Sequence, residues 1–408
     1  MKCIVIGASA AGMSAAKTLR ELDDNLDITL VSKDEKVYSR CILHHYISNH
    51  RTIEELNFTD KDLFDHYRVN WVKGVEVVKV DDTNKKIVLS NRAELEYDKL
   101  IIASGASSFI PPVKGLREGN NVVGLRNLDD AILIKEKAKE VKSAVVLGAG
   151  LVGIDALTGL LNYDIELSLV EMGNKVLPLQ LDEYTSKVYK DAFEAKNVNI
   201  KLNVTVEELI LDEYNNPKEL LLNTGEKIPC ELVIVATGVR ANVAFLEGSN
   251  IECDRFGLII DDKGQTSAKD VYGCGDVTGR NPIWPTATKE GIIAAKNALG
   301  KEAHMNDFFS SKNTMNFLSI PTMSVGMVEP EDETYIVEIK ITEENYKKII
   351  HKDGKIYGAI IQGDLSYAGV LTQLIKENID ISEVKKNIFD IDYADFFNLE
   401  KNLEFSYN

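Results

Sequence analysis

Cysteine is scarce in this sequence, and its few copies are not paired. The five cysteines, Cys3, Cys41, Cys230, Cys253 and Cys274, are scattered over 408 residues, and no two of them form a CxxC motif. An odd number of widely spaced cysteines is typical of reduced thiols. We therefore expect neither a disulfide framework nor a zinc site, and no other metal site is indicated.

Positive charge is also in deficit. The chain has 47 basic and 64 acidic residues, giving a net charge of −17, which disfavours nucleic acid and anionic membrane surfaces as partners. The apolar run in MKCIVIGASAAG is far too short to span a membrane, and no signal-peptide cleavage site follows it. We expect a cytoplasmic protein of two or three domains, because a domain averages roughly 150 residues.

One pattern is present twice. The run KCIVIG at 2–7 has the β-branched residues of a strand, GASAAGMSAAKTLREL continues with helical spacing, and ITLVS at 28–32 is a second strand. AVVLGAGLVGIDALTGLL at 144–161 and IELSLVE at 165–171 repeat this order. Two strand–helix–strand units with glycine-rich first turns predict two dinucleotide-binding sites.

The glycines of these turns have separate roles. In the second copy Gly148, Gly150 and Gly153 complete the motif GxGxxG. The first glycine permits a sharp turn, the second brings the backbone close to a pyrophosphate, and the third lets the helix pack on the strand. The first copy keeps Gly7 and Gly12, with serine at the middle position.

The end of the second strand in each unit determines which ribose is held. Glu171 ends the strand of the second copy, where a carboxylate accepts hydrogen bonds from ribose hydroxyls and repels a 2′-phosphate. NADH is thus favoured over NADPH, although Lys175 lies nearby in the sequence. In the first copy the matching residue is Ser32, and Asp34 or Glu35 could serve instead.

Three further segments surround these units. LIIASGA at 100–106 and LVIVATGV at 232–239 are apolar strands that end in small residues, which allow a cofactor to approach the backbone. VYGCGDV at 271–277 places Asp276 directly after a strand, and a helix follows in ATKEGIIAAKNAL. An aspartate there could bind a hydroxylated chain such as the ribitol of a flavin.

Taken in order, GASAAG, ASG, GAGLVG with Glu171, ATGV and YGCGD make the sequence similar to the FAD-dependent pyridine nucleotide-disulfide oxidoreductase superfamily over residues 1–300. The resemblance implies an α/β fold with two nested Rossmann-like domains, for FAD and NAD, and a C-terminal α+β interface domain. It places the FAD site at Gly7, Ser9, Gly12, Ser104, Gly105 and Asp276, and the NADH site at Gly148, Gly150, Gly153 and Glu171. Further expected cofactor-binding positions are Ala10, Ser32, Asp34, Ser39, Arg40, Ala103, Val152, Asp155, Gly238, Gly275 and Ala287.

The same resemblance sets the domain boundaries. Residues 1–108 and 241–309 are expected to bind FAD, residues 109–240 to bind NADH, and residues 310–408 to form the third domain. IPPVKG is expected to be the first crossing between the nucleotide domains.

The third domain is expected to contain two strands, TYIVEIKI and KIYGAIIQGD, with a polar turn between them, and a helix in YAGVLTQLIKENI. This segment resembles the tails of NADH:rubredoxin and nitrite-reductase-type members. The resemblance makes a homodimer through this domain plausible, although rubredoxin-reductase-like members can be monomers.

VYSRCILHHYI contains the candidate catalytic residues. Where the two-cysteine branch of the superfamily has CxxxxC, this sequence offers only Cys41. Single-cysteine members include coenzyme A-disulfide reductases, NADH oxidases and NADH peroxidases, whereas the rubredoxin and nitrite reductase relatives usually have proline after YSR. If ILHHYIS begins a helix, its dipole and Arg40, His44 or His45 should lower the pKa of the Cys41 thiol. The alternative is a buried, inert cysteine.

His44 or His45 is also a candidate acid or base near the flavin, although both could simply lie on the helix surface or pack against FAD. The resemblance argues against a peroxidase, because NADH oxidases and peroxidases of the single-cysteine type carry a histidine inside the first glycine turn. This sequence has Ala10 and Ala11 there.

These observations predict an enzyme that passes electrons from NADH through FAD to a disulfide, oxygen or another small acceptor, with Cys41 as redox thiol. A first alternative is an NADH:rubredoxin-type reductase without a redox thiol, whose acceptor is a small redox protein. A second is a non-catalytic sensor that binds FAD and NADH.

Overall fold

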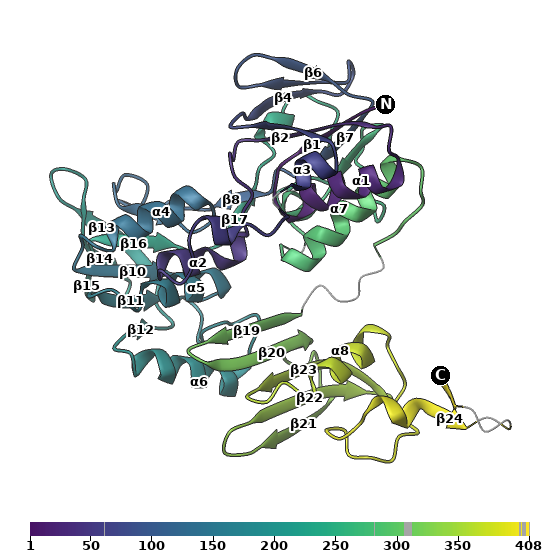
Figure 1. The fold of residues 1–408 in the computed structure, drawn as a ribbon. Coiled ribbons are helices and arrows are strands. Elements are labelled where there is room, and N and C mark those ends of the chain that lie inside the picture. Colours follow the sequence, from purple (N-terminus) through teal and green to yellow (C-terminus); the bar gives the residue numbers. More distant parts are fainter. Residues whose placement is uncertain (61, 281, 306–311, 400, 402–404, 408) are drawn as a thin grey trace. The chain divides into compact units, whose positions relative to one another are not determined.

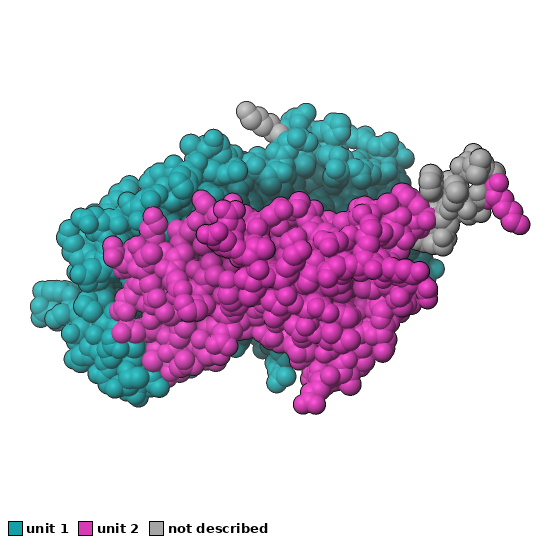
Figure 2. All heavy atoms as spheres, turned by 90° about the horizontal axis from the view of Figure 1, so that it is seen from below, with its two compact units in different colours: residues 1–148, 155–167, 206–307 teal, residues 149–154, 168–205, 308–408 magenta. Residues whose placement is uncertain are grey.

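The computed structural model describes residues 1–60, 62–280, 282–305, 312–399, 401 and 405–407. Contacts divide the chain into two units, which Figure 2 shows in different colours. The first unit contains residues 1–148, 155–167 and 206–307, and the second contains residues 149–154, 168–205 and 308–408.

A parallel five-stranded sheet of order β18-β7-β1-β2-β3 forms the core of the first unit (Figure 1). Side chains alternate along β1: Cys3 and Val5 pack in the cluster that includes helices α1 and α7, while Ile4 and Ile6 pack in the cluster on the other face, beneath β4 and β5. Both faces are buried, as is usual for parallel sheets. The elements are β1 (Lys2–Ile6), α1 (Ala10–Leu22), β2 (Asp27–Ser32), β3 (Val69–Lys73), β4 (Val77–Asp81), β5 (Lys86–Leu89), β6 (Glu94–Glu96), β7 (Lys99–Ile102), β18 (Val271–Gly273) and α7 (Trp284–Ala298).

Small residues let α1 and α7 pack side by side (Figure 1). A Cβ atom on Gly291 of α7 would come within 2.2 Å of the Ala11 carbonyl oxygen, and one on Gly12 would come within 1.9 Å of the Gly7 carbonyl oxygen. The run of alanine and glycine in the first copy therefore brings α1 against both its own strand and α7.

Two short strands, β8 (Ala106–Ser108) and β17 (Val239–Ala241), pair antiparallel and carry the chain out of and back into the region around the first sheet. Between them β10, β16 and β9 pair in parallel, and β13, β14 and β15 form an antiparallel sheet. Their bounds, with those of the intervening helices, are α2 (Leu43–Ile47), α3 (Leu63–His66), β9 (Val122–Gly124), α4 (Leu128–Lys137), β10 (Ser143–Leu147), α5 (Leu151–Leu160), β11 (Glu166–Val170), β13 (Val206–Leu211), β14 (Pro217–Leu222), β15 (Lys227–Pro229) and β16 (Leu232–Val235).

The C-terminal part of the second unit is an antiparallel sheet of order β19-β20-β23-β22-β21. Helix α8 packs on one face of this sheet through an apolar cluster, and α6 lies against the other, where the Tyr189 hydroxyl donates to the Ile320 carbonyl. The elements are α6 (Glu183–Glu194), β12 (Asn199–Lys201), β19 (Asn313–Phe317), β20 (Ile320–Gly326), β21 (Ile336–Ile341), β22 (Tyr346–Lys352), β23 (Lys355–Gln362), α8 (Ala368–Lys376), β24 (Phe397–Leu399) and β25 (Phe405–Tyr407).

The predicted polar turn between the two strands of this domain is wrong. The segment between these strands contains β22, whose Ile349 and Ile350 are buried although three lysines and a histidine surround them in the sequence. The α/β class itself, with Rossmann-like parallel sheets and a C-terminal α+β part, is confirmed. No helix in the described part of the chain combines the length and apolarity that crossing a membrane requires.

Candidate active site

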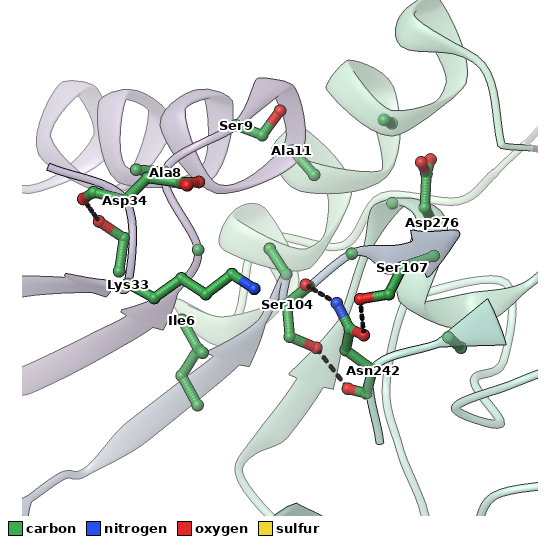
Figure 3. A pocket seen from close by; sticks show the side chains of 18 of the residues that line it. Ile6, Ala8, Ser9, Ala11, Lys33, Asp34, Ser104, Ser107, Asn242 and Asp276 are labelled. Atoms are coloured by element: carbon green, nitrogen blue, oxygen red, sulfur yellow. Dashed lines mark hydrogen bonds between the residues drawn. The ribbon is translucent and has the colours of Figure 1, made fainter. Parts of the chain in front are cut away.

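A cavity of about 540 Å³ opens at the carboxyl ends of the first sheet, beside the amino end of α1 (Figure 3). This is the edge at which open α/β sheets bind ligands. Among the sequence-predicted residues, the cavity is lined by Gly7, Ser9, Ala10, Ser32, Asp34, Arg40, Cys41, Ala103, Ser104, Gly105, Gly275, Asp276 and Ala287.

The glycine positions of the cavity fit a cofactor cradle. Gly7 has φ 109°, and a Cβ there would come within 2.1 Å of the Ala103 carbonyl oxygen, so the sharp turn after β1 requires glycine. Gly105 has φ 67°, and no atom lies within 4 Å of the position of a Cβ atom. Its backbone therefore borders open space in the cavity.

The amino end of α1 is available to an anion. Ser9 is the N-cap residue but makes no side-chain capping hydrogen bond. The first amides of a helix have no partner within the helix, and together with the helix dipole they bind phosphate well. The first glycine turn thus presents N–H groups to the cavity, as a pyrophosphate requires.

Asp276 is held by a residue that sequence reasoning missed. Its Oδ2 atom accepts a hydrogen bond from Nη2 of Arg126, whose Nε also donates to the Ala106 carbonyl at 3.1 Å. Both residues line the cavity. The predicted aspartate is therefore one half of an ion pair at the cavity wall.

Asn242, a second residue that the sequence did not predict, links Ser104 and Ser107 through hydrogen bonds in the cavity wall (Figure 3). Its Nδ2 donates to the Ser104 carbonyl at 3.0 Å, while the hydroxyl of Ser104 donates to the Asn242 carbonyl at 2.9 Å. The Ser107 hydroxyl donates to Asn242 Oδ1 at 2.8 Å. Figure 3 also shows the Lys33 side chain extending toward Ser104. A cation and a rigid polar floor thus face the same space.

The ribose-side residues of the first copy are already engaged with each other. Arg40 Nη2 lies 2.7 Å from Asp34 Oδ2, and Arg40 Nη1 donates to the Tyr38 hydroxyl at 2.8 Å. The Ser32 hydroxyl donates to the Asp34 carbonyl and accepts from the Trp71 indole N–H. The Ser32 hydroxyl has already donated its proton, whereas the Asp34 carboxylate, which accepts from Arg40 and Tyr38, keeps further lone pairs and is the better candidate for a ribose contact.

Cys41 lies in the cavity, but the expectation of a lowered thiol pKa is wrong for this structure. Although the residue is exposed, protein atoms crowd its thiol, and this desolvation raises the pKa, as do the negative charges of Asp155 and Asp276. The helix that follows, α2, has five residues and starts at Leu43, so its dipole is short. Arg40 directs its guanidinium to other partners.

The histidines lie away from the cavity wall. The His44 side chain is 11% exposed, and its buried Nδ1 atom, 3.2 Å from Asp155 Oδ1, has no hydrogen-bond partner among the described residues. Burial lowers the pKa of His44 to about 3 and raises the pKa of Asp155 well above its usual range. The His45 ring packs against that of His44, with centroids 4.1 Å apart. A neutral imidazole beside a buried carboxyl can hold and move a proton.

Two residues predicted for the first site, Gly12 and Ser39, do not line the cavity. Gly12 instead lets α1 pack on its strand. The cavity-lining residues that the sequence did not predict include Ala8, Ala11, Lys33, Arg126, Asn127 and Asn242.

In the second glycine turn the backbone requires Gly148, and Gly150 has open space beside it. Gly148 has φ 102°, and a Cβ there would come within 2.6 Å of the Ala236 carbonyl oxygen. No atom lies within 4 Å of the position of a Cβ on Gly150. Gly238 has φ 106° and accepts a backbone hydrogen bond from Phe109, and Val152 is exposed at the start of α5.

The Glu171 carboxylate is held in a fixed position. Its Oε2 atom accepts from the Ala149 amide and its Oε1 atom from the Gly173 amide, both at 2.7 Å. Each carboxylate oxygen has a second lone pair, so hydrogen bonds from ribose hydroxyls can still be accepted. The acidic residue is thus oriented beside the glycine turn before any nucleotide binds.

Glu290 gives the first site a pH-dependent stability. This residue of α7 is 4% exposed, and its Oε2 atom accepts from the Gly275 amide at 2.6 Å. Burial raises its pKa to about 7. Because the pKa of Glu290 is higher in the folded than in the unfolded protein, the protonated carboxyl stabilises the fold, fully so below the unfolded pKa of about 4.5. This contribution of about 3 kcal/mol to the free energy of unfolding is lost as pH rises through about 7.

We therefore expect Glu290→Gln to be about as stable as the parent protein at pH 5 and more stable by about 2–3 kcal/mol above pH 8, since glutamine keeps an acceptor for Gly275 but never ionises. Urea unfolding of the ligand-free protein at both pH values measures this. Equal differences between the two proteins at both pH values would contradict the assignment.

Known proteins resemble this chain over most of its length. The family model for pyridine nucleotide-disulphide oxidoreductases matches residues 1–291, and the rubredoxin NAD⁺ reductase C-terminal domain model matches residues 312–379. The chain is 28% identical over 396 residues to an NADH-rubredoxin oxidoreductase of Clostridium acetobutylicum, covering 96% of this chain and 97% of that protein. It is 27% identical over 354 residues to a coenzyme A disulfide reductase of Staphylococcus aureus, covering 81% and 78%. A solved NAD-dependent persulfide reductase from A. fulgidus has the same fold, with a TM-score of 0.84 at 24% identity, over 93% of this chain and 77% of that one.

Proposed function

Because the chain belongs to the pyridine nucleotide-disulphide oxidoreductase family, we propose that it is an NADH-dependent FAD oxidoreductase that reduces a disulfide or a similar small acceptor through Cys41. One observation carries this proposal. Cys41 lines the same cavity as the glycine cradle and Asp276. A thiol that lines the cavity suited to the flavin is in the place where an electron acceptor would meet it.

The residues of the cavity suit FAD. The amides at the start of α1 would hold the pyrophosphate, Asp34 the adenosine ribose, and the Asp276–Arg126 pair the polar chain beside the flavin ring. When bound, FAD carries an electron pair from NADH to the acceptor. Residues 1–108 and 241–309 are proposed to form the FAD domain, residues 109–240 the NADH domain and residues 310–408 the third, since cavity residues come from both FAD segments.

The proposed reaction balances as NADH, one proton and a disulfide giving NAD⁺ and two thiols. The Cys41 thiolate attacks one sulfur of the acceptor, forms a mixed disulfide and releases the other half as a thiol. Two electrons and a proton then cleave the mixed disulfide and restore the thiolate. The scattered, unpaired cysteines support a reducing, cytoplasmic location for such chemistry.

The raised pKa of Cys41 calls for a base. Asp155 lies close enough for its charge to affect this pKa, and the neutral His44 imidazole has its Nδ1 atom 3.2 Å from Asp155 Oδ1. We propose that the Asp155 carboxylate, which its raised pKa makes the stronger base of the two, takes up the thiol proton and returns it to the departing thiol, with His44 beside it.

Anaerobic titration with NADH tests the proposal. If the isolated enzyme carries Cys41 as a mixed disulfide or sulfenate, full reduction consumes about two equivalents of NADH, against about one for flavin alone. A thiolate-to-flavin charge-transfer band should accompany the first equivalent. Turnover with coenzyme A disulfide or polysulfide, compared with oxygen, nitrite and rubredoxin, then identifies the acceptor class. One equivalent and no disulfide turnover would contradict the proposal.

A second candidate function is electron transfer to a small redox protein such as rubredoxin. The match of residues 312–379 to the rubredoxin NAD⁺ reductase C-terminal model favours it. The full-length similarity to an NADH-rubredoxin oxidoreductase does so too. This function needs no thiol, so it predicts one equivalent of NADH and turnover with rubredoxin that is independent of Cys41.

We also propose a preference for NADH, set by Glu171 and sharpened by Glu329. Lys175, the cation near Glu171 in the sequence, has its Nζ atom 3.9 Å from Glu329 Oε1, and Lys348 Nζ lies 2.8 Å from Glu329 Oε2. A lysine paired with a carboxylate is less able to receive a 2′-phosphate.

Glu329→Gln should therefore raise kcat/KM for NADPH about 3- to 10-fold while changing that for NADH little, since a partly exposed ion pair contributes little energy. Lys348 keeps Asp182 as its partner, so the fold should hold. Steady-state kinetics with both nucleotides measure the ratio, and Glu331→Gln, a change of the same charge two residues away, is the control. An unchanged ratio in the Glu329 variant would remove this residue from the specificity of the enzyme.

A further inference from the structure

Glu290 is a buried acid directly behind the wall of the cavity. It is 4% exposed, and its Oε2 atom accepts a hydrogen bond from the Gly275 amide at 2.6 Å. Gly275 lines the cavity, and so does Ala287, which lies three residues before Glu290 on the same side of α7. The carboxyl group does not line the cavity itself, but only the residues of one turn and one helix separate it from the space that suits the flavin.

No basic side chain among the described residues forms an ion pair with this carboxyl group. The positive charge of Arg280 acts on Glu290, but its guanidinium donates to the Ile260 carbonyl. Asp276 contributes a negative charge, which Arg126 offsets through its ion pair. A carboxylate that is buried with an amide donor and without a cation is unfavourable, so a nearby change of charge shifts its protonation readily.

The other described elements that pack against α7 supply no partner for Glu290. Helix α1 meets α7 at Gly291 through residues 10–16, AAGMSAA, which contain no ionisable side chain. The Cys274 thiol is neutral, because burial raises its pKa. On the strands β18 and β7 the ionisable groups have partners of their own, Tyr272 with the Asn297 carbonyl and Lys99 with Asp270. The protonation of Glu290 therefore depends on its burial and on the charge that the cavity holds.

We propose that Glu290 binds one proton from solvent when a flavin in this cavity is reduced, and releases it when the flavin is reoxidised. A hydride from NADH carries two electrons and one proton, so the flavin ring gains one negative charge. The balanced step takes FAD, NADH, one solvent proton and the Glu290 carboxylate to the singly protonated reduced flavin, NAD⁺ and the Glu290 carboxylic acid. This inference rests on the proposed FAD site, and it requires no role for Cys41.

The physical cause is repulsion between like charges at a site with little water. A negative charge on the flavin disfavours a second one on Glu290, so reduction increases the proton affinity of this carboxyl group. The coupling is reciprocal, because a carboxyl group that holds a proton makes reduction of the flavin easier by the same free energy. Glu290 thereby keeps the buried charge behind the cavity constant while electrons arrive and leave.

The coupling should appear above neutral pH. Burial raises the pKa of Glu290 to about 7 before any charge is added in the cavity. Below that pH the group holds its proton in both redox states, and above it the proton is bound only on reduction, until pH exceeds the still higher pKa of the reduced state. One additional proton for two electrons makes the midpoint potential fall by about 30 mV more for each pH unit.

Spectroelectrochemical titration of the FAD-loaded enzyme from about pH 7 to about pH 8.5 tests the proposal, since this range lies above the pKa of Glu290 in the oxidised state. The Cys41→Ser background removes any thiol couple from the measurement. With Glu290 present, the slope should approach about 59 mV per pH unit, and Glu290→Gln should lower it to about 30 mV. The glutamine variant should therefore be the easier protein to reduce at the upper end of the range.

Infrared difference spectra between the reduced and oxidised enzyme give a second measurement. Above neutral pH the reduced enzyme should gain the carbonyl band of a protonated carboxyl group, and Glu290→Gln should lack it. The control is Glu21→Gln, which removes the same charge from an exposed position of α1. This variant should keep both the steep slope and the carboxyl band.

A slope of about 30 mV with Glu290 present, the same slope in the glutamine variant, or a carboxyl band that survives the substitution would each overturn the proposal. If Glu290→Gln failed to hold FAD, the slope and the band of the protein with Glu290 would decide the question. A chain that binds no FAD at all would contradict the proposed function instead. A flat slope in an enzyme that binds FAD and oxidises NADH would remove the role of Glu290 alone.

Discussion

The Cys41→Ser variant should lose disulfide reduction by at least about 10²-fold while it keeps bound FAD and reduction by NADH, because an alcohol does not form the mixed disulfide. Serine is nearly isosteric, and Cys41 is an exposed residue, so the cavity should remain intact. Turnover with a disulfide acceptor and with an artificial one-electron dye, measured side by side, separates the thiol step from the earlier electron transfer. The NADH titration of this variant should end at about one equivalent.

Cys253→Ser is the matched control for this prediction. Cys253 is the other exposed cysteine, and it lies outside the cavity. Its replacement should leave turnover with every acceptor unchanged. Full turnover of the Cys41 variant with disulfides would place the thiol outside the reaction, and full turnover with rubredoxin but not with disulfides would favour the second candidate function for that partner.

The pH dependence of this step follows from the same residues. Because the pKa of Cys41 is raised, disulfide turnover should increase as pH rises, and a proton acceptor near the thiol reduces this dependence. His44→Ala should therefore make the increase steeper without changing reduction by NADH. A profile identical to that of the parent protein would leave the His44–Asp155 pair without a role in the thiol step.

The glycine turns could be predicted from the sequence because their causes are local. Gly7 and Gly148 have positive φ, and a side chain on either would meet the carbonyl of the neighbouring parallel strand. This geometry recurs wherever a strand turns sharply into a helix over a nucleotide. Short-range backbone constraints of this kind are visible in residue type and spacing alone.

The polar partners of the cavity could not be predicted, because they come from distant parts of the chain. Arg126 pairs with Asp276, 150 positions away, and Asn242 bonds Ser104, 138 positions away. Neither Arg126 nor Asn242 belongs to a recognisable motif in this sequence. Only the folded chain brings them to the carboxyl ends of the first sheet.

The error at Cys41 has a different origin. The sequence suggested that Arg40 and the histidines would lower the pKa of the Cys41 thiol, yet the sign of a pKa shift depends on burial and on where each charge points. Arg40 is engaged by Asp34, and His44 is neutral because it is buried. β22 was not predicted because the lysines and histidine around its two buried isoleucines make the segment appear to be a polar turn in the sequence.

Replacement of Gly150 by alanine should raise the KM for NADH by about 10²-fold and leave the bound flavin in place. The ligand-free fold has room for this methyl group, since no atom lies within 4 Å of a Cβ built there. The space it would fill is the space that the middle glycine of GxGxxG leaves for the pyrophosphate, so the clash appears only with nucleotide bound. Rapid-reaction measurement of flavin reduction against NADH concentration gives the dissociation constant directly.

Two other glycines show why this prediction is specific. Gly12→Ala would press on the Gly7 carbonyl oxygen at 1.9 Å, so it should lose FAD or fail to fold. Gly369→Ala has free space in α8 and should change nothing except a small gain in helix stability. If Gly150→Ala bound NADH as tightly as the parent protein, the pyrophosphate could not pass over this turn. The assignment of the second glycine motif to NADH would then fail while the FAD site, which rests on different residues, would stand.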